Sequence, residues 1–338
     1  MNALIPNIHN VLTASFCRAF EKLGISVYVP AVDEVGQATL SKYQSPLAGA
    51  FDFQPFATAE QVRNCRIVEL EALADVDIDM IVIGGHGVQR AALKFLMPML
   101  QRRRQVHLIY FCGNEIPNYR WDIVNNLLCA DEISWSRHGS HIANATRYYP
   151  WIDYDRFAWI EPNDGRSLVS CIINYASRYP ADFEMARTIV ASVARLQHEL
   201  IDKVSHASVA EIIQRCAASL HIKPEEGYGY AVIESLACGR PIIAPRRYVQ
   251  GRSMARWCID GETAILFDSV EDARQSLTKF FDDAALRHAL QRSSAQRIRS
   301  IIDNDEQTDV LGKFIQRLRP QPAKNLKSHL LDFRWRHI

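Results

Sequence analysis

Short apolar runs alternate with amphipathic segments over the first 150 residues. Residues 2–6, 77–85 (DIDMIVIGG) and 106–113 (VHLIYFCG) are rich in β-branched and other apolar side chains, a pattern typical of strands buried on both faces of a parallel sheet. Apolar residues recur at helical spacing over residues 11–23, which predicts a helix, and residues 24–30 predict the strand that follows it. Strand, helix and strand in this order indicate a parallel sheet covered by helices.

The remaining segments of this half are less regular. Apolar spacing predicts helices over residues 91–100 and 121–128, and strands over residues 131–136 and 147–153. The stretch from residue 33 to residue 59 is polar, contains Gly and Pro and has no clear period. We expect it to form a long loop.

A second alternation begins after the polar segment EPNDGR at residues 161–166. It comprises strands at 167–176, 218–224, 241–245 and 264–268, and helices at 182–196, at 209–217 and from about Ala231. A length of 338 residues suits two domains. We therefore predict two Rossmann-like α/β domains facing across a cleft, residues 1–155 and 156–312, followed by a basic tail, residues 313–338, that returns as a helix to the first domain.

Composition and charge exclude several classes of protein. Apolar residues make up 48% of the chain and charged residues 23%, as in ordinary globular proteins, and the net charge of +1 does not by itself indicate a nucleic-acid or membrane partner. The 8 cysteines are scattered without a CxxC pair, which argues against a zinc site or a disulfide framework. No signal peptide or membrane-spanning stretch is visible. We expect a cytoplasmic protein.

The most informative segment is HIKPEEGYGYAVIESLACGRPIIAP, residues 221–245. A predicted strand runs into an acidic turn that contains glycine and then into a helix, whose first backbone N–H groups can bind an anion such as a phosphate. Glu226 lies in the turn and Glu234 lies about one helical turn inside the helix. Each carboxylate can accept hydrogen bonds from sugar hydroxyls. The alternative is that Glu226 only complements the helix dipole and that Glu234 is a solvated surface residue.

These residues resemble a known family. Glu226, seven residues and Glu234, within EGYGYAVIESLACGRPII, resemble the E-x7-E signature of retaining glycosyltransferases of the GT-B fold, particularly family 4 of the nucleotide-sugar-dependent enzymes. Residues 259–290 resemble the strand and helices that follow this signature in the family. DIDMIVIGGHG resembles the strand of the first domain that ends in a histidine, and residues 147–157 resemble the family's linker between domains.

The resemblance implies a metal-independent enzyme with no cofactor, in which the first domain binds the acceptor and the second binds the nucleotide sugar. Glu226 would contact the donor sugar, His86 would approach that sugar from the first domain, and Glu234 would bind the ribose. The backbone N–H groups that would line the sugar-phosphate pocket are those of Tyr228, Gly229 and Tyr230. His86 also stands at the end of a predicted buried strand, where open α/β sheets bind ligands.

The reaction needs positive charge beside the departing diphosphate. Family members usually carry an Arg and a Lys after the first strand of the second domain, but only Arg178 stands near that place here, and no Lys-Gly pair follows it. Lys223 could supply the missing charge, and Arg187, Arg246 and Arg247 are further candidates. Asn114 and Glu115, just past the strand that ends at Gly113, could orient an acceptor hydroxyl or could simply form a turn and helix cap.

The chain end is cationic: residues 311–338 carry seven basic residues and one acidic residue. Either it is the returning helix, or it is an electrostatic site for DNA or an anionic surface. The sequence thus predicts a glycosyltransferase whose acceptor is a carbohydrate, a lipid-linked molecule or a nucleic acid. Two alternatives remain: a DNA-modifying glycosyltransferase acting on hydroxylated bases, and a non-catalytic relative that binds a sugar or nucleotide.

Overall fold

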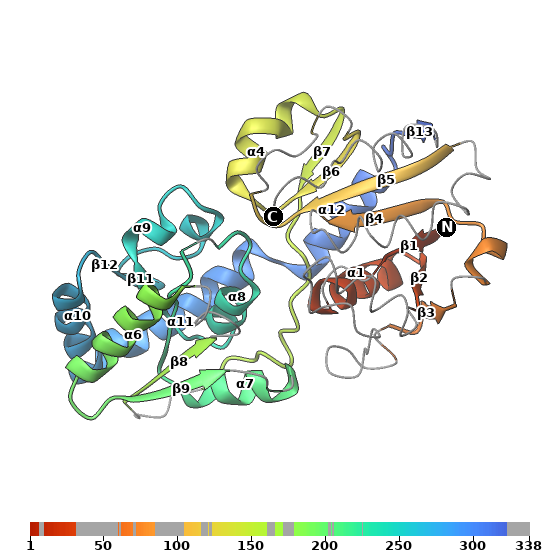
Figure 1. Ribbon diagram of the computed structural model, residues 1–338. Coiled ribbons are helices and arrows are strands. Elements are labelled where there is room, and N and C mark those ends of the chain that lie inside the picture. The colour runs from red at the N-terminus through yellow and green to blue at the C-terminus, as the bar shows by residue number, and fades with distance from the viewer. Residues whose placement is uncertain are drawn as a thin grey trace. The chain divides into compact units, whose positions relative to one another are not determined.

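Two compact units make up the protein (Figure 1). The computed structural model describes residues 1–6, 10–31, 60, 62–69, 72–84, 105–115, 121, 124–160, 166–171, 179–201, 204, 206–224 and 226–322. Unit 1 comprises Met1–Trp151 and the chain from Asn304 onward, and unit 2 comprises Ile152–Asp303. The sequence placed these boundaries after residues 155 and 312. The chain instead leaves and re-enters unit 1 at one place, where Trp151 Nε1 donates a hydrogen bond of 3.0 Å to the Asn304 carbonyl.

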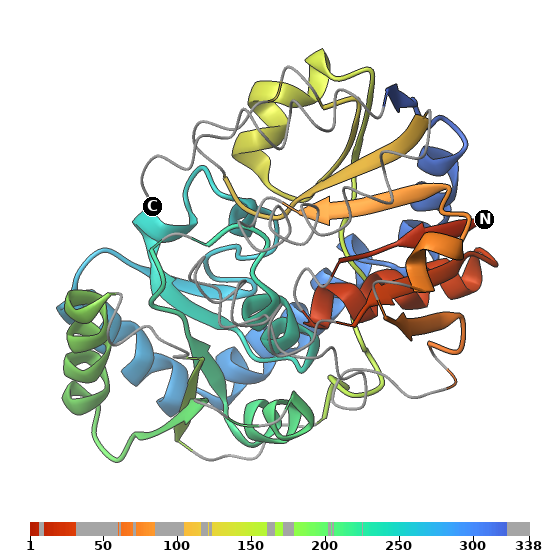
Figure 2. The ribbon, with the colours of Figure 1, turned by 45° about the vertical axis from the view of Figure 1, so that its right-hand side comes forward.

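Unit 1 is built on a sheet with the strand order β3-β2-β1-β4-β5-β6-β7, in which all neighbours along this order are parallel. The strands are β1 (Asn2–Leu4), β2 (Ser26–Pro30), β3 (Cys65–Val68), β4 (Met80–Gly84), β5 (Gln105–Cys112), β6 (Asn126–Cys129) and β7 (Asn144–Arg147). A short strand, β13 (Gln321–Pro322), pairs antiparallel with β5. The paired strands β4 and β5 are visible in Figure 2 as orange and gold arrows. The predicted strands at the start of the chain, before residue 85 and before residue 113 are confirmed.

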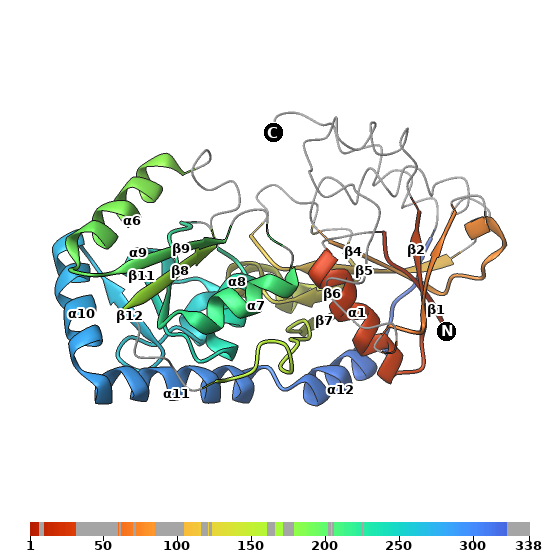
Figure 3. The same cartoon turned by 90° about the horizontal axis from the view of Figure 1, so that it is seen from below.

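Helices α1 (Asn10–Lys22), α4 (Glu132–His138) and α12 (Asn304–Ile315) belong to unit 1, with 3-10 turns at Ala72–Asp75 and Gly139–His141. The apolar face of α1 packs into the core, where the Phe16 ring stacks on Tyr148 at 5.6 Å and meets Phe111 edge to face at 5.7 Å. Helix α12 lies beside α1 (Figure 3), and an ion pair joins Lys22 to Asp305. The predicted return of the chain therefore begins at residue 304 rather than at residue 313.

The predictions for residues 121–136 were wrong. A helix was expected over 121–128 and a strand over 131–136, whereas β6 occupies Asn126–Cys129 and α4 begins at Glu132. The reason is a cap: the Asp131 side chain accepts a hydrogen bond of 2.7 Å from the Ser134 N–H and starts the helix there. Strand β7 also begins and ends earlier than the predicted 147–153. The expected loop at 33–59 and the expected helix at 91–100 both lie outside the described residues.

Unit 2 contains a second, fully parallel sheet with the strand order β12-β11-β10-β8-β9. Its strands are β8 (Ser167–Cys171), β9 (Gln197–Ile201), β10 (Ala218–Leu220), β11 (Ile242–Pro245) and β12 (Ala264–Phe267). Its helices are α6 (Pro180–Ser192), α7 (His206–Arg215), α8 (Tyr230–Ala237), α9 (Arg246–Val249), α10 (Val270–Asp282) and α11 (Ala284–Ile301), with a 3-10 turn at Ser253–Arg256. Helix α6 packs against α10, and α8 packs against α11. This doubly wound order agrees with the predicted fold class.

Strand β9 was not predicted. A helix was predicted over residues 182–196, but α6 ends at Ser192 and β9 begins at Gln197. An edge strand is solvated on one side, and QHELI contains too few apolar residues to show a buried-strand pattern. Strand β10 is also shorter than expected and ends at Leu220, before the Pro224 that was predicted to end it. Within the described residues, none of the helices has both the length and the apolar character that crossing a bilayer requires.

Candidate functional site

The strand order of unit 2 identifies the edge where a ligand is expected. From β8 the chain moves to β9 on one side of the sheet, and from β10 it moves to β11 on the other side. In open α/β sheets, ligands bind outside the carboxyl ends of the strands at such a switch point. Because β10 ends at Leu220, the turn that follows it, from His221 to Glu226, begins at this point.

Three ionisable side chains gather in this turn. Lys223 Nζ lies 2.9 Å from Glu226 Oε1, and His221 Nε2 lies 3.8 Å from Glu226 Oε2. Glu226 and His221 are each only 6% exposed. Burial lowers the pKa of His221 to about 4, an effect that Glu226 opposes and Lys223 reinforces. The turn therefore holds a buried carboxylate, paired with the partly buried Lys223, beside an imidazole that is uncharged at neutral pH.

Gly229 connects this turn to α8. Its φ of +70° is in the left-handed region, and a Cβ at this position would lie 2.9 Å from Glu226 Cγ. Glycine is needed for both reasons, since another residue would be strained and would push Glu226 away. The Gly229 carbonyl accepts the N–H groups of Val232 and Ile233, at 3.0 and 3.1 Å, and so begins the helix. The positive end of the α8 dipole lies directly after the Lys223–Glu226 pair in the chain.

Aromatic rings pack together directly after the turn. Tyr228 is 3% exposed and meets the ring of Tyr230 edge to face at 5.1 Å. On its other side Tyr228 meets the fully buried Trp257 at 6.0 Å, again edge to face. Tyr228, one of the predicted donor-binding residues, is thus part of a packed wall, and only its backbone is suited to contact a phosphate.

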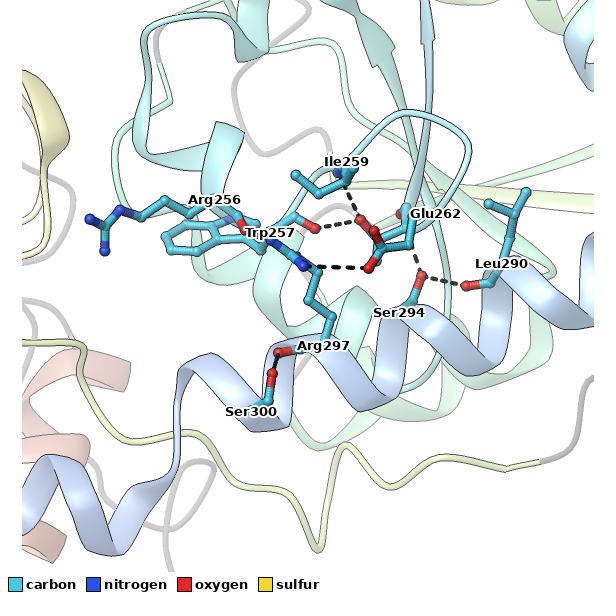
Figure 4. A network of polar contacts seen from close by, with 9 residues as sticks. Arg256, Trp257, Ile259, Glu262, Leu290, Ser294, Arg297 and Ser300 are labelled. Carbon is cyan, nitrogen blue, oxygen red and sulfur yellow. Dashed lines mark hydrogen bonds and ion pairs between the residues drawn. The ribbon is translucent and has the colours of Figure 1, made fainter.

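A polar network fixes the loop that carries Trp257 (Figure 4). The Thr263 hydroxyl donates to the Trp257 carbonyl at 2.5 Å and accepts from the Ile259 N–H at 2.8 Å. Arg297 on α11 donates from Nε and Nη2 to the Arg256 carbonyl, at 3.1 and 3.0 Å. Helix α11 and the loop before β12 therefore hold the wall behind Tyr228 in place.

Glu234 lies on α8 with a defined partner. The carboxylate is 6% exposed, and its Oε1 lies 3.0 Å from His206 Nε2 on α7. The alternative interpretation, a solvated surface residue, is therefore wrong. Neither His206 nor His221 was among the predicted site residues. A separation of 28 residues between His206 and Glu234 carries no periodic signal, and only the packing of α7 reveals the contact.

The other predicted site residues are distributed over both units. His86 and Arg178 lie outside the described residues, although β4 ends at Gly84, two residues before His86. Asn114 and Glu115 follow β5 in unit 1, where Glu115 forms an ion pair of 2.5 Å with Arg137 and the Asn114 carbonyl accepts from Cys112 Sγ at 3.2 Å.

The described candidate cations differ in their surroundings. Hydrogen bonds to Asp260 and Asp268 raise the pKa of Arg246 and occupy its guanidinium. Arg187 is exposed and pairs with Glu184 at 3.3 Å. Among the described candidates, Lys223 is the one paired with Glu226 at the switch-point edge. The part of the chain that the structure describes holds no group of three or more His, Cys, Asp or Glu side chains that could bind a metal ion.

The described start of the basic tail is engaged within unit 1. Arg317 donates from Nη2 to the Thr146 hydroxyl at 3.1 Å. The Arg319 N–H donates to Asn126 Oδ1 at 2.7 Å, and Asn126 Nδ2 donates back to the Arg319 carbonyl at 2.9 Å. These contacts fit the returning-chain interpretation, and the residues from 323 onward lie outside the described part.

Comparison with known proteins identifies this architecture. A family model described as glycosyl transferase-like matches residues 170–309, a span that contains Glu226 and Glu234. No curated protein matches the sequence significantly. Among solved structures, HepE from Anabaena in complex with UDP and glucose is 10% identical, with a TM-score of 0.63 over 94% of this chain and 100% of that one.

Two further structures are similar over nearly their whole length. Sucrose-phosphate synthase from Thermosynechococcus elongatus is 13% identical, with a TM-score of 0.58 over 93% of this chain and 98% of that one. A glycosyltransferase from Rickettsia africae is 11% identical, with a TM-score of 0.55 over 98% of this chain and 99% of that one. At such low identity the likeness shows the fold. The chain has the GT-B fold of two parallel-sheet α/β domains, and this fold together with the glycosyl transferase-like match over residues 170–309 supports a glycosyltransferase enzyme.

Proposed function

We propose that the protein is a retaining glycosyltransferase, similar to family 4, that moves a sugar from a nucleoside diphosphate donor to a hydroxyl group. The observation that carries this proposal is the pairing of Lys223 with the buried Glu226 carboxylate, at the carboxyl end of β10 and directly before α8. Glu234 follows on the same helix. The complexes of HepE with UDP and glucose and with UDP-glucose make a UDP-sugar the first donor to test.

Each group has a separate task in this proposal. The Lys223 ammonium and the N-terminal end of α8 stabilise the negative charge that grows on the departing diphosphate. Glu226 accepts a hydrogen bond from a hydroxyl of the donor sugar, and Glu234 accepts hydrogen bonds from the ribose. The backbone N–H groups of 228–230 face the sugar phosphate. On the resemblance to the family, we assign His86 to the donor sugar and Arg178 to the diphosphate.

The bond changes balance without an added reactant. The bond between the anomeric carbon and the diphosphate oxygen breaks, and the acceptor oxygen attacks the same face of the sugar that the diphosphate leaves. The acceptor proton passes to an oxygen of the departing diphosphate, so no protein base is required. Because Lys223 and the helix terminus supply positive charge, we propose that no metal ion is needed. Asn114 and Glu115 remain candidates for binding the acceptor.

The test compares Glu226→Gln with Glu271→Gln, which changes an exposed carboxylate on α10 that bonds Arg274. We expect Glu226→Gln to lower the turnover of a UDP-sugar, measured as released UDP, by about 10²-fold or more, the size found for one transition-state hydrogen bond. Glu271→Gln should retain wild-type turnover. Equal turnover in both variants, with wild type active, would remove Glu226 from the reaction. Analysis of the product's anomeric configuration by NMR tests retention separately.

A further inference from the structure

A chain of polar contacts leads from Glu234 to the first residues of unit 2. His206 Nε2 lies 3.0 Å from Glu234 Oε1, and the other ring nitrogen, Nδ1, lies 3.1 Å from Arg156 Nη1. His206 is the first residue of α7, and Arg156 lies in the segment that enters unit 2. All three side chains belong to unit 2, so their geometry does not depend on unit 1.

The Arg156 contact fixes which ring nitrogen of His206 carries the proton. A guanidinium has donors only and stays protonated, so His206 Nδ1 must accept its hydrogen bond. The imidazole is then neutral with its proton on Nε2, and Nε2 donates to Glu234 Oε1. Arg156 therefore determines that His206 presents a donor, and not an acceptor, to the carboxylate.

The segment that holds Arg156 is itself anchored. The Asp153 side chain accepts from the Arg156 N–H at 3.2 Å and lies 3.7 Å from its Nε. Gln214, near the other end of α7, donates from Nε2 to the carbonyls of Arg156 and Ala158, each at 3.2 Å. The Phe157 ring is 1% exposed and meets the His206 ring edge to face at 5.4 Å.

A close backbone contact adds to this anchoring. The Trp159 ring lies so near Gly239, which has a φ of +74°, that a Cβ at residue 239 would be 1.9 Å from it. The entering segment is thus fixed to α7 and to the end of α8. Arg156 has little freedom to leave His206, and His206 has little freedom to turn.

We infer that His206, oriented by Arg156, is a positioning residue that fixes the Glu234 carboxylate for recognition of a ribose 2′-hydroxyl. This inference rests on the proposed function. The His206 ring hydrogen-bonds to Oε1 of Glu234. Among the described residues, the Glu234 carboxylate makes no other side-chain hydrogen bond. In this inference Oε2 therefore accepts the hydrogen bond from the ligand hydroxyl. A carboxylate that is buried this deeply needs such a donor, because burial removes the water molecules that would otherwise hydrogen-bond to it.

The experiment measures affinity for UDP and for 2′-deoxy-UDP by calorimetry in wild type and variants. Wild type should bind UDP at least about tenfold more tightly, the effect of one hydrogen bond to a charged group. His206→Ala should reduce this ratio toward one. His206→Gln should restore most of it, because the Gln amide nitrogen can take the position of Nε2. His198→Ala, which removes a unit 2 histidine on β9 that contacts Ser170, should keep the wild-type ratio.

Two further measurements separate positioning from a general structural role. In a Glu234→Gln background, His206→Ala should change the UDP/2′-deoxy-UDP ratio no further, whereas a structural effect would add to it. Arg156→Met, which keeps the His206 ring, should reduce the ratio in the same direction, and it tests the inference even if His206→Ala does not fold. His206→Ala should also raise KM for the donor more than it lowers kcat.

Failure of the inference about His206 can be distinguished from failure of the proposed function. If wild type binds neither nucleotide, the proposed donor is wrong and the inference falls with it. If wild type prefers UDP but the folded His206 and Arg156 variants keep the same ratio, the inference is overturned and the proposed function stands. If wild type binds UDP and 2′-deoxy-UDP equally, Glu234 does not read the 2′-hydroxyl, which also overturns the inference.

Discussion

His221 shows how a single residue in the candidate site links burial to pH. Burial holds its pKa at about 4, below the ordinary value of about 6.5 for histidine. Between these two values the unfolded chain binds a proton that the folded chain does not bind. Stability is therefore fully present above about pH 6.5 and is lost as the pH falls toward 4. Glu226 and Lys223 are the charged groups that act on the ring, and their effects on its pKa oppose each other.

We expect the free energy of unfolding to fall by up to about 3 kcal/mol from pH 7 to pH 4 through His221 alone, at about 1.36 kcal/mol per pKa unit. His221→Gln should flatten this part of the pH dependence, and His141→Gln, which changes an exposed histidine of unit 1, should leave it as in wild type. Urea denaturation at several pH values measures the slope. An unchanged slope in His221→Gln would mean that the imidazole is charged in the folded protein.

At this scale the sequence draws attention to residues of one turn and one helix, but not to the histidines that contact them. Glu226, Gly229 and Glu234 are recognisable because their spacing and the glycine pattern are local features of one turn and one helix. His206 and His221 are not, because their importance comes from burial and from contacts with another element. Lys223 became a candidate because the chain lacks the family's usual Arg and Lys after the first strand of the second domain. Its pairing with Glu226 depends on how the turn folds, and residue spacing alone does not predict that.

Among the elements, α7 carries His206 at its start and is held at its other end by Arg240. This side chain is fully buried and donates from Nη2 to the Gln214 carbonyl at 2.7 Å and from Nε to the Ile213 carbonyl at 3.4 Å. Burial lowers the pKa of Arg240. The Gln214 carbonyl in the last turn of α7 gains a donor in this way, whereas the Ile213 carbonyl also accepts from the Cys216 N–H at 3.1 Å. The positive charge complements the negative end of the helix dipole.

Replacing Arg240 with Met should therefore lower the free energy of unfolding by about 1–3 kcal/mol, since it leaves the Gln214 carbonyl without its donor. It should also weaken UDP binding, because α7 carries His206. Arg215→Met is the matched control: this arginine of α7 is exposed, and its ion pair with Glu199 should contribute at most about 1 kcal/mol. Equal losses in the two variants, measured by urea denaturation, would show that Arg240 does not stabilise the end of α7.

Prediction of elements succeeded where burial is complete and failed at edges and caps. Strands β4 and β5 are continuous apolar runs between neighbouring strands, so their sequences leave no other interpretation. Strand β9 lies at a sheet edge, and Leu200, its exposed apolar residue, is 44% accessible, so neither face shows a pattern. The reversal of strand and helix around residue 131 came from overlooking the cap at Asp131, a single side-chain contact.

At the scale of the whole molecule, the order of residues along the chain does not match the division into units. Helix α12 follows α11 of unit 2 after two residues, yet it belongs to the core of unit 1. Gln307 on α12 accepts the Tyr149 N–H at 2.8 Å, and Phe314 is fully buried. The predicted returning tail had the right destination for its first residues but the wrong start, because the polar residues at 304–306 conceal the beginning of a packed helix.

This division gives a prediction that separates stability from ligand binding. Phe314→Ala should lower the free energy of unfolding by about 3–5 kcal/mol, because it removes a fully buried ring from the core of unit 1. The Kd for UDP should stay at the wild-type value under conditions where the variant is folded, since Lys223, Glu226 and Glu234 all belong to unit 2.

Phe280→Ala on α10 removes an equally buried ring from unit 2 and is the matched comparison. Calorimetric melting with and without UDP should show that the nucleotide raises the transition of unit 2, the one lowered by Phe280→Ala, because a ligand stabilises only the unit whose folded form binds it. If UDP instead raised the transition that Phe314→Ala lowers, the nucleotide would bind to unit 1. The buried turn before α8 would then have a structural role, and the donor would have to be sought at the carboxyl ends of β1 and β4, the switch point of the other sheet.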